Sequence, residues 1–578
     1  MLSPVSSNNI IPRWQRHQMP AVLSMETIIE EYQSPLDKLY LWERVCPDKI
    51  YLHQAVNNSW KTWTWRQVGE ESRRLAAYLI NLNLPIPSKI GLISRNCAHW
   101  IICDLAIMIS GHISVPLYPN LTAASINYIL RHSDAVLLFV GKLDDWPSMK
   151  EGIPEGMKCI TFPFYPNIDC ITWSDIILGY APLKENNQRS SEEVGTIIYT
   201  SGTTGVPKGV VHQFKSFSFT TLNSIPYLGF NMNSRFFSYL PLSHSAERSL
   251  VEMGSLYSGG EIYFSESVSS FSKNLADAKP TEFLAVHHIW KKIQQHIIKG
   301  ISQRKLDIFL KLPFISGWVK RKIKKSIGLQ YANNIIAGAS PMPVDLMEWF
   351  AAVGINIQEG YGLTENWSYS HINRRDNIKL GYVGQPFPGV ECMVGKDGEI
   401  QVRHKGLMKE YYKDKEKTAN AFTGDGFLKT EDIGYVDDEG FLKITGRNKD
   451  IFKTSKGNYV TPSPIEMQLS GNENIDFACV VGNHLPQPMA LIILSVIGKS
   501  KPRDVLTEEM KTLYDKLNSS LDVYDRLSKI VIINNKWDVE QGLLTPTLKV
   551  KRKEVEKRYG SFFQLWQLKE DFMVITDA

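Results

Sequence analysis

The feature that most constrains the fold is an alternation of short apolar runs with segments of helical spacing, which begins near residue 89. Residues 89–94 and 135–141 are typical of short buried strands, and residues 122–134 have helical spacing behind a capping threonine. The alternation resumes at 194–200, 261–266, 281–286 and 333–340. Strands and helices that alternate in this way form parallel sheets covered by helices on both faces. We therefore predict an α/β fold whose large N-terminal body has mostly parallel layers.

The pattern changes in the C-terminal third of the chain. After residue 385, DG and DEG turns lie between β-rich runs, which predicts antiparallel hairpins. From about residue 450 the chain has further strands and helices of its own. With 578 residues it is too long for one ordinary domain. We expect a β-rich subdomain attached to the body, followed by a small α+β C-terminal domain.

Composition excludes several classes of protein. The formal net charge of +5 is too small to indicate nucleic-acid binding, and the seven cysteines lack metal-binding spacing. Their odd number favours a reducing compartment. The first twenty residues have no apolar core of the kind found in signal peptides. The most apolar stretch, 100–118, contains Asp104 and predicts a buried helix and strand, not a membrane span. We expect a cytoplasmic protein.

A loop rich in Ser, Thr and Gly interrupts an apolar run at 196-TIIYTSGTTGVPKGVVHQ-213. Its candidate phosphate-binding residues are Thr200, Ser201, Gly202, Thr203, Thr204 and Gly205. Glycines let backbone N–H groups turn inward to bind an anion, and Lys208 adds a positive charge. The alternative is a polar surface turn between two strands. So many glycines and hydroxyls beside a buried strand favour bound phosphate.

A second cluster is 357-IQEGYGLTENW-367. Tyr361 lies between Gly360 and Gly362, where an aromatic face can stack on a base. Glu365 follows, and a carboxylate close to phosphates is most useful when it holds Mg²⁺. An acidic first turn of a helix explains this cluster equally well on its own.

Two further clusters lie toward the C-terminus. In 428-LKTEDIGYVDDEGFLKITGRNKD-450, Asp432 can accept hydrogen bonds from a ribose diol and Arg447 can reach the same ribose or a phosphate. In 543-LLTPTLKVKRKEVEKRY-559, Lys549, Lys551 and Arg552 precede a helix. A basic, solvated helix start would account for this last run if it stood alone.

Together these clusters resemble the adenylate-forming (AMP-binding) superfamily, which includes acyl-CoA synthetases, luciferases and the adenylation domains of peptide synthetases. YTSGTTGVPKGV is similar to its phosphate loop, GYGLTE to its adenine and metal motif, and KTEDIG with GRNKD to its ribose motif and hinge. LPLSHSAER (240–248), SKGNYVTPSPIE (455–466) and LTPTLKVKR (544–552) resemble the long-chain fatty acyl-CoA synthetase branch. Leu548 stands where other branches usually have glycine. The resemblance runs from about residue 35 to 560.

The resemblance implies a role for each matched position. Residues 200–205 and Lys208 would cover the β- and γ-phosphates, Asp432 and Arg447 would bind the ribose, and His244 would line the acyl pocket. The other implied ATP-binding residues are Gly338, Ala339, Ser340, Glu359, Gly360, Tyr361 and Gly362. The implied catalytic residues are Lys549, Glu365, Thr364 and His244, and the implied Mg²⁺ ligands are Glu365 and Thr200. The domains would be residues 1–446, with the β-rich subdomain at about 385–446, a hinge at 447–449 that includes Lys449, and a mobile domain at 450–578.

The implied reaction is the ATP-dependent activation of a long-chain fatty acid through acyl-AMP to acyl-CoA, with release of AMP and pyrophosphate. ATP, Mg²⁺ and coenzyme A would be the co-substrates. Two alternatives stay open: a fatty acyl-AMP ligase that loads a carrier protein, and a catalytically inactive nucleotide- or acyl-binding homologue. The first usually carries an insertion after the ribose region, and no clear one is visible. The second would have lost some of the four motifs, and all are present.

Two segments bear on the acyl substrate and on partners. His287 and His288 replace the Pro-Arg that long-chain members usually carry, which changes the local wall of the acyl site. Residues 304–325 mix Leu, Ile, Phe and Trp with eight Lys or Arg. This segment is either a basic amphipathic contact with the inner face of a membrane or a helical insertion packed on the body, and Pro313 favours the second. A homodimer is a further candidate assembly.

Overall fold

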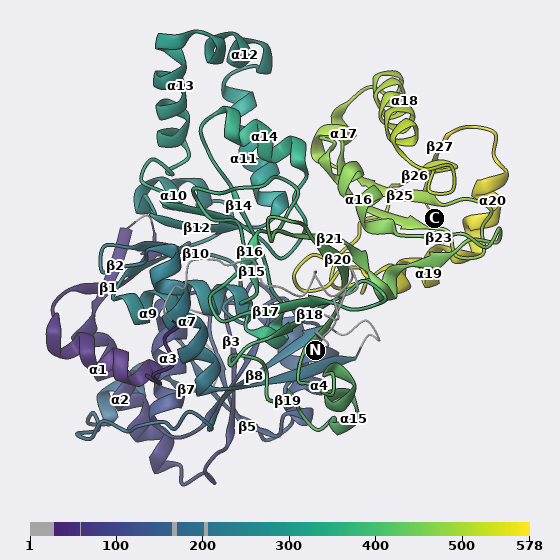
Figure 1. Cartoon of the computed structure of the whole chain (residues 1–578). Coiled ribbons are helices and arrows are strands. Elements are labelled where there is room, and N and C mark those ends of the chain that lie inside the picture. Colours follow the sequence, from purple (N-terminus) through teal and green to yellow (C-terminus); the bar gives the residue numbers. More distant parts are fainter. Residues whose placement is uncertain (1–27, 58, 164–169, 202–205, 578) are drawn as a thin grey trace, which may run out of the picture.

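The computed structural model describes residues 28–57, 59–163, 170–201 and 206–577. Figure 1 shows a large body and, beside it, a smaller domain formed by the C-terminal part of the chain. The two large sheets of the body are mainly parallel and are covered by helices. The predicted class, mixed α/β with a separate C-terminal domain, is confirmed. The exact domain boundaries and the hinge at 447–449 stay predictions.

One sheet of the body has eight strands. Their spatial order is β19 (Glu410–Tyr411), β9 (Pro207–Gln213), β8 (Val194–Ser201), β4 (Ile113–Leu117), β3 (Lys89–Ile93), β5 (Ala135–Val140), β6 (Lys158–Thr161) and β7 (Ile171–Thr172). β3 pairs in parallel with β4 and β5, as the alternation of apolar runs predicts. β8 and β9 form an antiparallel hairpin in which Thr200 lies opposite Lys208. This hairpin flanks the predicted phosphate loop, whose residues 202–205 lie outside the described part of the chain.

The other sheet has nine strands. Their spatial order is β16 (Gln385–Pro386), β15 (His371–Ile372), β14 (Gln358–Tyr361), β13 (Asn334–Ala337), β12 (Glu282–Ala285), β10 (Arg235–Ser238), β11 (Glu261–Phe264), β1 (Ile50–Val56) and β2 (Ser59–Thr64). β13 and β14 are parallel, with Ala337 opposite Glu359. The predicted motif at 338–340 therefore follows β13 beside the end of β14, which includes residues 360 and 361 of the other motif.

Helices fill and cover the space around the two sheets. Those of the body are α1 (Pro35–Val45), α2 (Trp65–Asn81), α3 (Ala98–Ile109), α4 (Ala123–His132), α5 (Trp146–Met149), α6 (Trp173–Gly179), α7 (Phe214–Leu228), α8 (Ser245–Glu247), α9 (Gly254–Ser258), α10 (Phe271–Ala278), α11 (His287–Gly300), α12 (Gln303–Lys311), α13 (Pro313–Ser326), α14 (Val344–Ala352) and α15 (Lys415–Ala421). Every residue of α3 is buried, as expected for a helix that is apolar on all sides. It shares one core with residues of both sheets, including Phe139 and Phe236.

The β-rich part is an antiparallel sheet in the order β17 (Glu391–Val394), β18 (Glu399–Arg403), β20 (Leu428–Val436) and β21 (Leu442–Arg447). The C-terminal domain has a sheet in the order β24 (Ile475–Val481), β25 (Met489–Leu494), β26 (Lys529–Ile533) and β27 (Met573–Thr576), and a small hairpin of β22 (Phe452–Lys453) and β23 (Tyr459–Val460). Its helices are α16 (Pro462–Gly471), α17 (Val496–Ser500), α18 (Arg503–Ser520), α19 (Arg552–Tyr559) and α20 (Phe563–Leu568). Two apolar clusters cover the two faces of its sheet, so this domain has its own core.

The basic segment 304–325 forms two helices, α12 and α13, that extend from the body at its upper end (Figure 1). Pro313 begins α13, where its missing N–H costs no hydrogen bond. Leu306, Val319 and Ile323 are buried against the body, so the segment is a helical insertion packed on it, and its exposed side stays available for other contacts. None of the helices among the described residues is long and apolar enough to cross a bilayer.

Candidate active site

The candidate phosphate end of the site is formed by the β8–β9 hairpin and the segment after β14. The Oγ1 atom of Thr200 is buried and has no hydrogen-bond partner within the part of the chain that the structure describes. Lys208, opposite it on β9, donates from Nζ to Glu365 Oε1 at 2.7 Å. The hairpin register and this ion pair bring the predicted Mg²⁺ ligands and the predicted phosphate-binding lysine together.

Glu365 is held as a carboxylate by two neighbours. Tyr411 Oη donates to Glu365 Oε1 at 2.8 Å and accepts from Lys208 Nζ at 2.7 Å. Burial raises the pKa of Glu365, but the Lys208 charge and the two hydrogen bonds outweigh it and lower the pKa below its ordinary value. Sequence reasoning missed Tyr411, because β19 reaches this place only through its pairing with β9.

The residues present fit Mg²⁺ bound together with a nucleotide. Among the described residues no group of three or more His, Cys, Asp or Glu side chains could hold a metal ion. Mg²⁺ commonly uses one or two carboxylates and takes its other ligands from phosphate oxygens and water. The carboxylate of Glu365 and the unpartnered hydroxyl of Thr200 match that requirement.

The predicted ribose end of the site is built on one strand pair and a tyrosine. Asp432 on β20 lies opposite Arg447 on β21, and Arg447 Nε donates to Asp432 Oδ1 at 2.8 Å. Tyr361, at the end of β14, donates from Oη to Asp432 Oδ2 at 2.7 Å. Asp432 is buried, and both of its oxygens are fixed in direction by these partners. Tyr361 was expected to stack on adenine, and its contact with Asp432 places the predicted adenine and ribose residues side by side.

The segment after β13 packs closely on the segment after β14. A Cβ atom at Gly338 would come within 3.2 Å of the Gly360 carbonyl oxygen, and one at Gly362 within 2.5 Å of the Ser368 backbone. Ala339 has φ +66°, so the turn from Gly338 to Ser340 is tightly constrained. The backbone segments that carry the predicted adenine-binding residues therefore run close together.

Glu359 was also predicted to bind ATP, and its carboxyl group forms a hydrogen bond with the protein backbone. Its Oε1 accepts a hydrogen bond from the Met342 N–H at 3.1 Å, and the residue is 5% exposed. Burial raises its pKa to about 7, although the Met342 hydrogen bond opposes the shift. The carboxyl group therefore stabilises the turn after β13 that would back the adenine.

His244, the residue predicted to line the acyl pocket, lies near Thr364, an implied catalytic residue, through the neighbouring Ser245. His244 Nδ1 accepts from the Ala246 N–H at 3.1 Å, and burial, with the Lys549 charge adding to it, lowers the His244 pKa to about 4. The ring is thus neutral at pH 7. Thr364 is buried, and its Oγ1 accepts a long hydrogen bond from Ser245 Oγ at 3.5 Å. Its carbonyl accepts from His212 Nε2 at 2.7 Å, which anchors the 3-10 turn Thr364–Asn366 that carries Glu365.

Lys549 reaches this site from the C-terminal domain. The Thr545 N–H donates to the Lys549 carbonyl at 2.8 Å, and the Lys549 N–H donates to Thr545 Oγ1 at 3.0 Å, so these two residues close the loop. Asn120 Nδ2 of the body donates to the Pro546 carbonyl of this loop at 3.0 Å. Although much of the Lys549 side chain stays accessible, its surroundings desolvate the amine. Desolvation lowers its pKa to about 8, with Arg447 adding to the shift and Asp432 opposing it. Lys549 therefore lies within electrostatic range of the predicted ribose and acyl residues.

The long-chain-type Leu548 occupies a backbone conformation that favours glycine. Its φ is +62°, in the left-handed region, and the side chain is 41% exposed. The Leu548 N–H donates to the Thr545 carbonyl at 2.8 Å, and this hydrogen bond closes the turn that immediately precedes Lys549. This geometry gives the physical reason why glycine suits the position.

A buried ionic network beneath the site was not predicted. A π-helix at Arg248–Met253 places Arg248 between Asp104 of α3, at 2.5 Å, and Glu252, at 3.1 Å, and all three side chains are inaccessible to solvent. Arg248 also donates to Thr196 Oγ1 on β8 at 2.6 Å. Burial, and next the Asp104 charge, raise the pKa of Glu252, while Arg248 opposes the shift. The sequence signal was an Asp inside the most apolar stretch, since buried charges are almost always paired.

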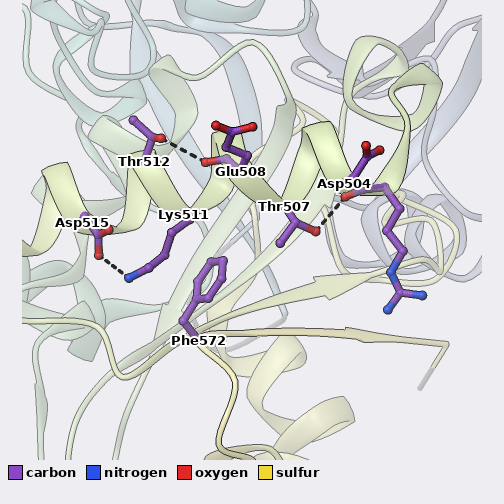
Figure 2. Close-up of a pocket in the computed structure, with 8 residues that line it drawn as sticks. Asp504, Thr507, Glu508, Lys511, Thr512, Asp515 and Phe572 are labelled. Atoms are coloured by element: carbon purple, nitrogen blue, oxygen red, sulfur yellow. Dashed lines mark hydrogen bonds and ion pairs between the residues drawn. The ribbon is translucent and has the colours of Figure 1, made fainter.

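A shallow groove lies apart from these residues, along α18 of the C-terminal domain (Figure 2). Its lining consists of Arg503, Asp504, Thr507, Glu508, Lys511, Thr512, Asp515 and Phe572. The Lys511–Asp515 ion pair, at 2.6 Å, and the two threonine hydroxyls are satisfied within the helix itself. The groove contains none of the predicted site residues.

Two family models match this chain. The model described as AMP-binding enzyme covers residues 41–412, and the AMP-binding enzyme C-terminal domain covers residues 449–563. The chain belongs to the AMP-binding enzyme family. Long-chain-fatty-acid–CoA ligase FadD15 of Mycobacterium bovis is 27% identical to this AMP-binding enzyme, covering 92% of this chain and 97% of its own. Long chain acyl-CoA synthetase 2 of Arabidopsis thaliana is 28% identical, covering 89% of each.

Solved structures share the fold of this AMP-binding enzyme. The anthranilate CoA ligase AuaEII in complex with anthranoyl-AMP has a TM-score of 0.76 at 22% identity and covers 93% of this chain and 99% of its own. The adenylation domain of a carboxylate reductase from Mycobacterium chelonae has a TM-score of 0.77 at 18% identity and covers 94% and 92%. The resemblance to the AMP-binding superfamily and its long-chain branch is therefore confirmed.

Proposed function

We propose that this AMP-binding enzyme is a long-chain fatty acid–CoA ligase that uses ATP, Mg²⁺ and coenzyme A. The observation that carries the proposal is a pair of contacts: Lys208 binds Glu365 at the phosphate end, and Lys549 of the C-terminal domain lies within electrostatic range of Asp432 and His244. The names of the relatives, which match along nearly their whole length, supply the substrate class. The fold of an anthranilate CoA ligase bound to its acyl-adenylate supports the reaction type.

The first half-reaction needs cations because two anions must meet. A carboxylate oxygen of the fatty acid attacks the α-phosphorus of ATP, a new P–O bond forms, and the bond to pyrophosphate breaks. Thr200, Lys208 and the 202–205 loop would hold the β- and γ-phosphates, and Lys549 would neutralise charge where acid and α-phosphate meet. Glu365 and Thr200 would hold Mg²⁺, which supplies charge neutralisation on the phosphates. Asp432 would accept hydrogen bonds from the ribose hydroxyls.

The second half-reaction replaces AMP by sulfur. The CoA thiol loses its proton and attacks the acyl carbonyl carbon, so that a C–S bond forms and the C–O bond to AMP breaks. Neutral His244, with its Nδ1 already engaged, can border the acyl group without adding charge beside it. Lys449, which pairs with Glu431 at 2.5 Å, lies where the proposed hinge would let the C-terminal domain turn between the two steps.

The test is exchange of labelled pyrophosphate into ATP across fatty acids of increasing length, followed by CoA consumption. Each additional buried CH₂ should add about 0.8 kcal/mol of binding until the acyl tunnel ends, so efficiency should rise with length and then level off. Exchange without use of CoA would instead indicate an acyl-AMP ligase that loads a carrier protein. No exchange with any acid would indicate a binding protein, and acetate as the best substrate would contradict the long-chain assignment.

We also propose that α12 and α13 rest on an anionic lipid surface. Their exposed apolar side chains gather around the turn between the helices: Ile308, Leu312, Phe314, Ile315 and Trp318. Phe314 is 96% exposed, and residues 304–325 include eight Lys or Arg. An apolar tip with a basic rim complements an anionic bilayer in both chemistry and charge. Such a contact would bring the enzyme to the phase in which long acyl chains dissolve.

Vesicle flotation tests this contact. Vesicles containing phosphatidylglycerol should carry the protein, pure phosphatidylcholine should carry less, and salt should weaken binding. Phe314→Ser should reduce flotation, whereas Leu178→Ser, at an 86% exposed residue of α6, should not. Equal flotation of both variants would contradict a lipid contact at the turn between α12 and α13. The homodimer stays a prediction, which sedimentation equilibrium would check.

A further inference from the structure

Lys291 belongs to the body, but the C-terminal domain supplies its hydrogen-bond partners. It lies in the second turn of α11, and its Nζ donates to the carbonyls of Ser470 and Ile475, each at 2.8 Å, and to that of Asn472. These carbonyls belong to Ser470 near the end of α16, to the capping residue Asn472 and to Ile475, the first residue of β24. Three main-chain acceptors around one ammonium group satisfy all of its donors.

In this contact, a lysine of the body caps the C-terminus of a helix in the C-terminal domain. The last carbonyls of a helix lack intrahelical partners and carry partial negative charge, which favours a cation. Burial lowers the pKa of Lys291 to about 8, with the charges of Asp476 and Glu473 opposing the shift. The amine therefore keeps its proton at pH 7. If the domains separated here, the ammonium and the carbonyls would have to find other partners in water.

This contact exists in the same domain arrangement that brings Lys549 to the site. Lys291 of the body reaches across to the end of α16, and Asn120 of the body reaches to the Pro546 carbonyl, in the same loop as Lys549. We infer that Lys291 is a positioning residue that holds the C-terminal domain in the orientation in which Lys549 serves acyl-AMP formation. The inference rests on the proposed function, because it assigns Lys291 to one half-reaction of that function.

The experiment replaces the ammonium while keeping an unbranched side chain. Lys291→Met should slow acyl-AMP formation from ATP and fatty acid by at least about tenfold, since hydrogen bonds to a charged group are lost. Thioester formation from pre-made acyl-AMP and CoA should be unchanged or faster. Lys292→Met, at the exposed neighbour on the same helix, should leave both steps unchanged. If Lys291→Met does not fold, Lys291→Gln, which keeps an N–H donor but no charge, is measured in the same way.

The outcomes separate this inference from the proposed function. A wild-type protein without either half-reaction would refute the proposed function. A fully active wild type whose Lys291→Met variant slows both half-reactions equally would overturn the positioning role. Small-angle X-ray scattering adds a readout that needs no activity. We expect the variant to show a more extended domain arrangement, and identical scattering curves for the two proteins would also overturn the inference.

Discussion

At the scale of single residues, Glu365 is the sharpest test of the phosphate end. Its carboxylate is held by Lys208 and Tyr411, so Glu365→Gln removes the charge and keeps the shape. We expect unchanged thermal unfolding and a loss of acyl-AMP formation of about two orders of magnitude or more, a size seen when one electrostatic group is removed from a transition state. Pyrophosphate exchange at several Mg²⁺ concentrations measures this. Near-normal exchange with unchanged Mg²⁺ dependence would remove Glu365 from the site.

Some site residues could be predicted from the sequence and some could not. Thr200 and Lys208 lie close in sequence within one hairpin, so their proximity could be predicted from the local sequence. Tyr411 contacts Glu365 across 46 positions, and Arg248 contacts Asp104 across 144. No local pattern encodes such contacts, because they depend on how elements distant in the sequence pack together. The hydrogen bond of Glu359 with the Met342 backbone could not be predicted either, and its role in ATP binding stays a prediction.

At the scale of elements, the alternation of apolar runs with helical segments correctly predicted several parallel strands. β3, β4 and β5 lie where the apolar runs predict them, because a strand buried on both faces must be apolar along its length. The order of strands in the two sheets, and their division into two, could not be predicted. Both depend on contacts between distant segments, such as β1 with β11.

The π-helix at 248–253 is joined to two other elements of the body by a buried arginine, and the contribution of this arginine to stability can be measured. Arg248 ties it to α3 through Asp104 and to β8 through Thr196. Arg248→Met should lower the free energy of unfolding of the body by about 3–5 kcal/mol, because it leaves two buried carboxyl groups without their cation. Arg66→Met, which breaks the exposed pair with Asp48, should cost under about 1 kcal/mol. Urea unfolding compares them, and equal losses would contradict a structural role for the network.

At the scale of the whole molecule, the function depends on which face the C-terminal domain presents. Lys549 lies within range of His244, Arg447 and Asp432 only because the two domains meet as they do. Lys549→Ala should therefore cripple acyl-AMP formation and largely spare thioester formation from pre-made acyl-AMP. Its pKa of about 8 adds a second signature. Raising the pH through 8 removes the charge, so kcat/KM for ATP should fall there, since this ratio reports groups of the free enzyme.

The basic run around Lys549 provides matched controls for this last prediction. Lys551 is close in sequence but is not matched to the catalytic position, and Lys551→Ala should leave both half-reactions near the wild-type rate. Arg552 is a less neutral control, because it binds Glu466 at 2.7 Å within the C-terminal domain. Its replacement should lower the stability of that domain and slow both steps together. If Lys549→Ala also slows both steps equally, or if Lys551→Ala damages adenylation as much, then Lys549 does not act in one orientation alone and the two-orientation mechanism must be given up.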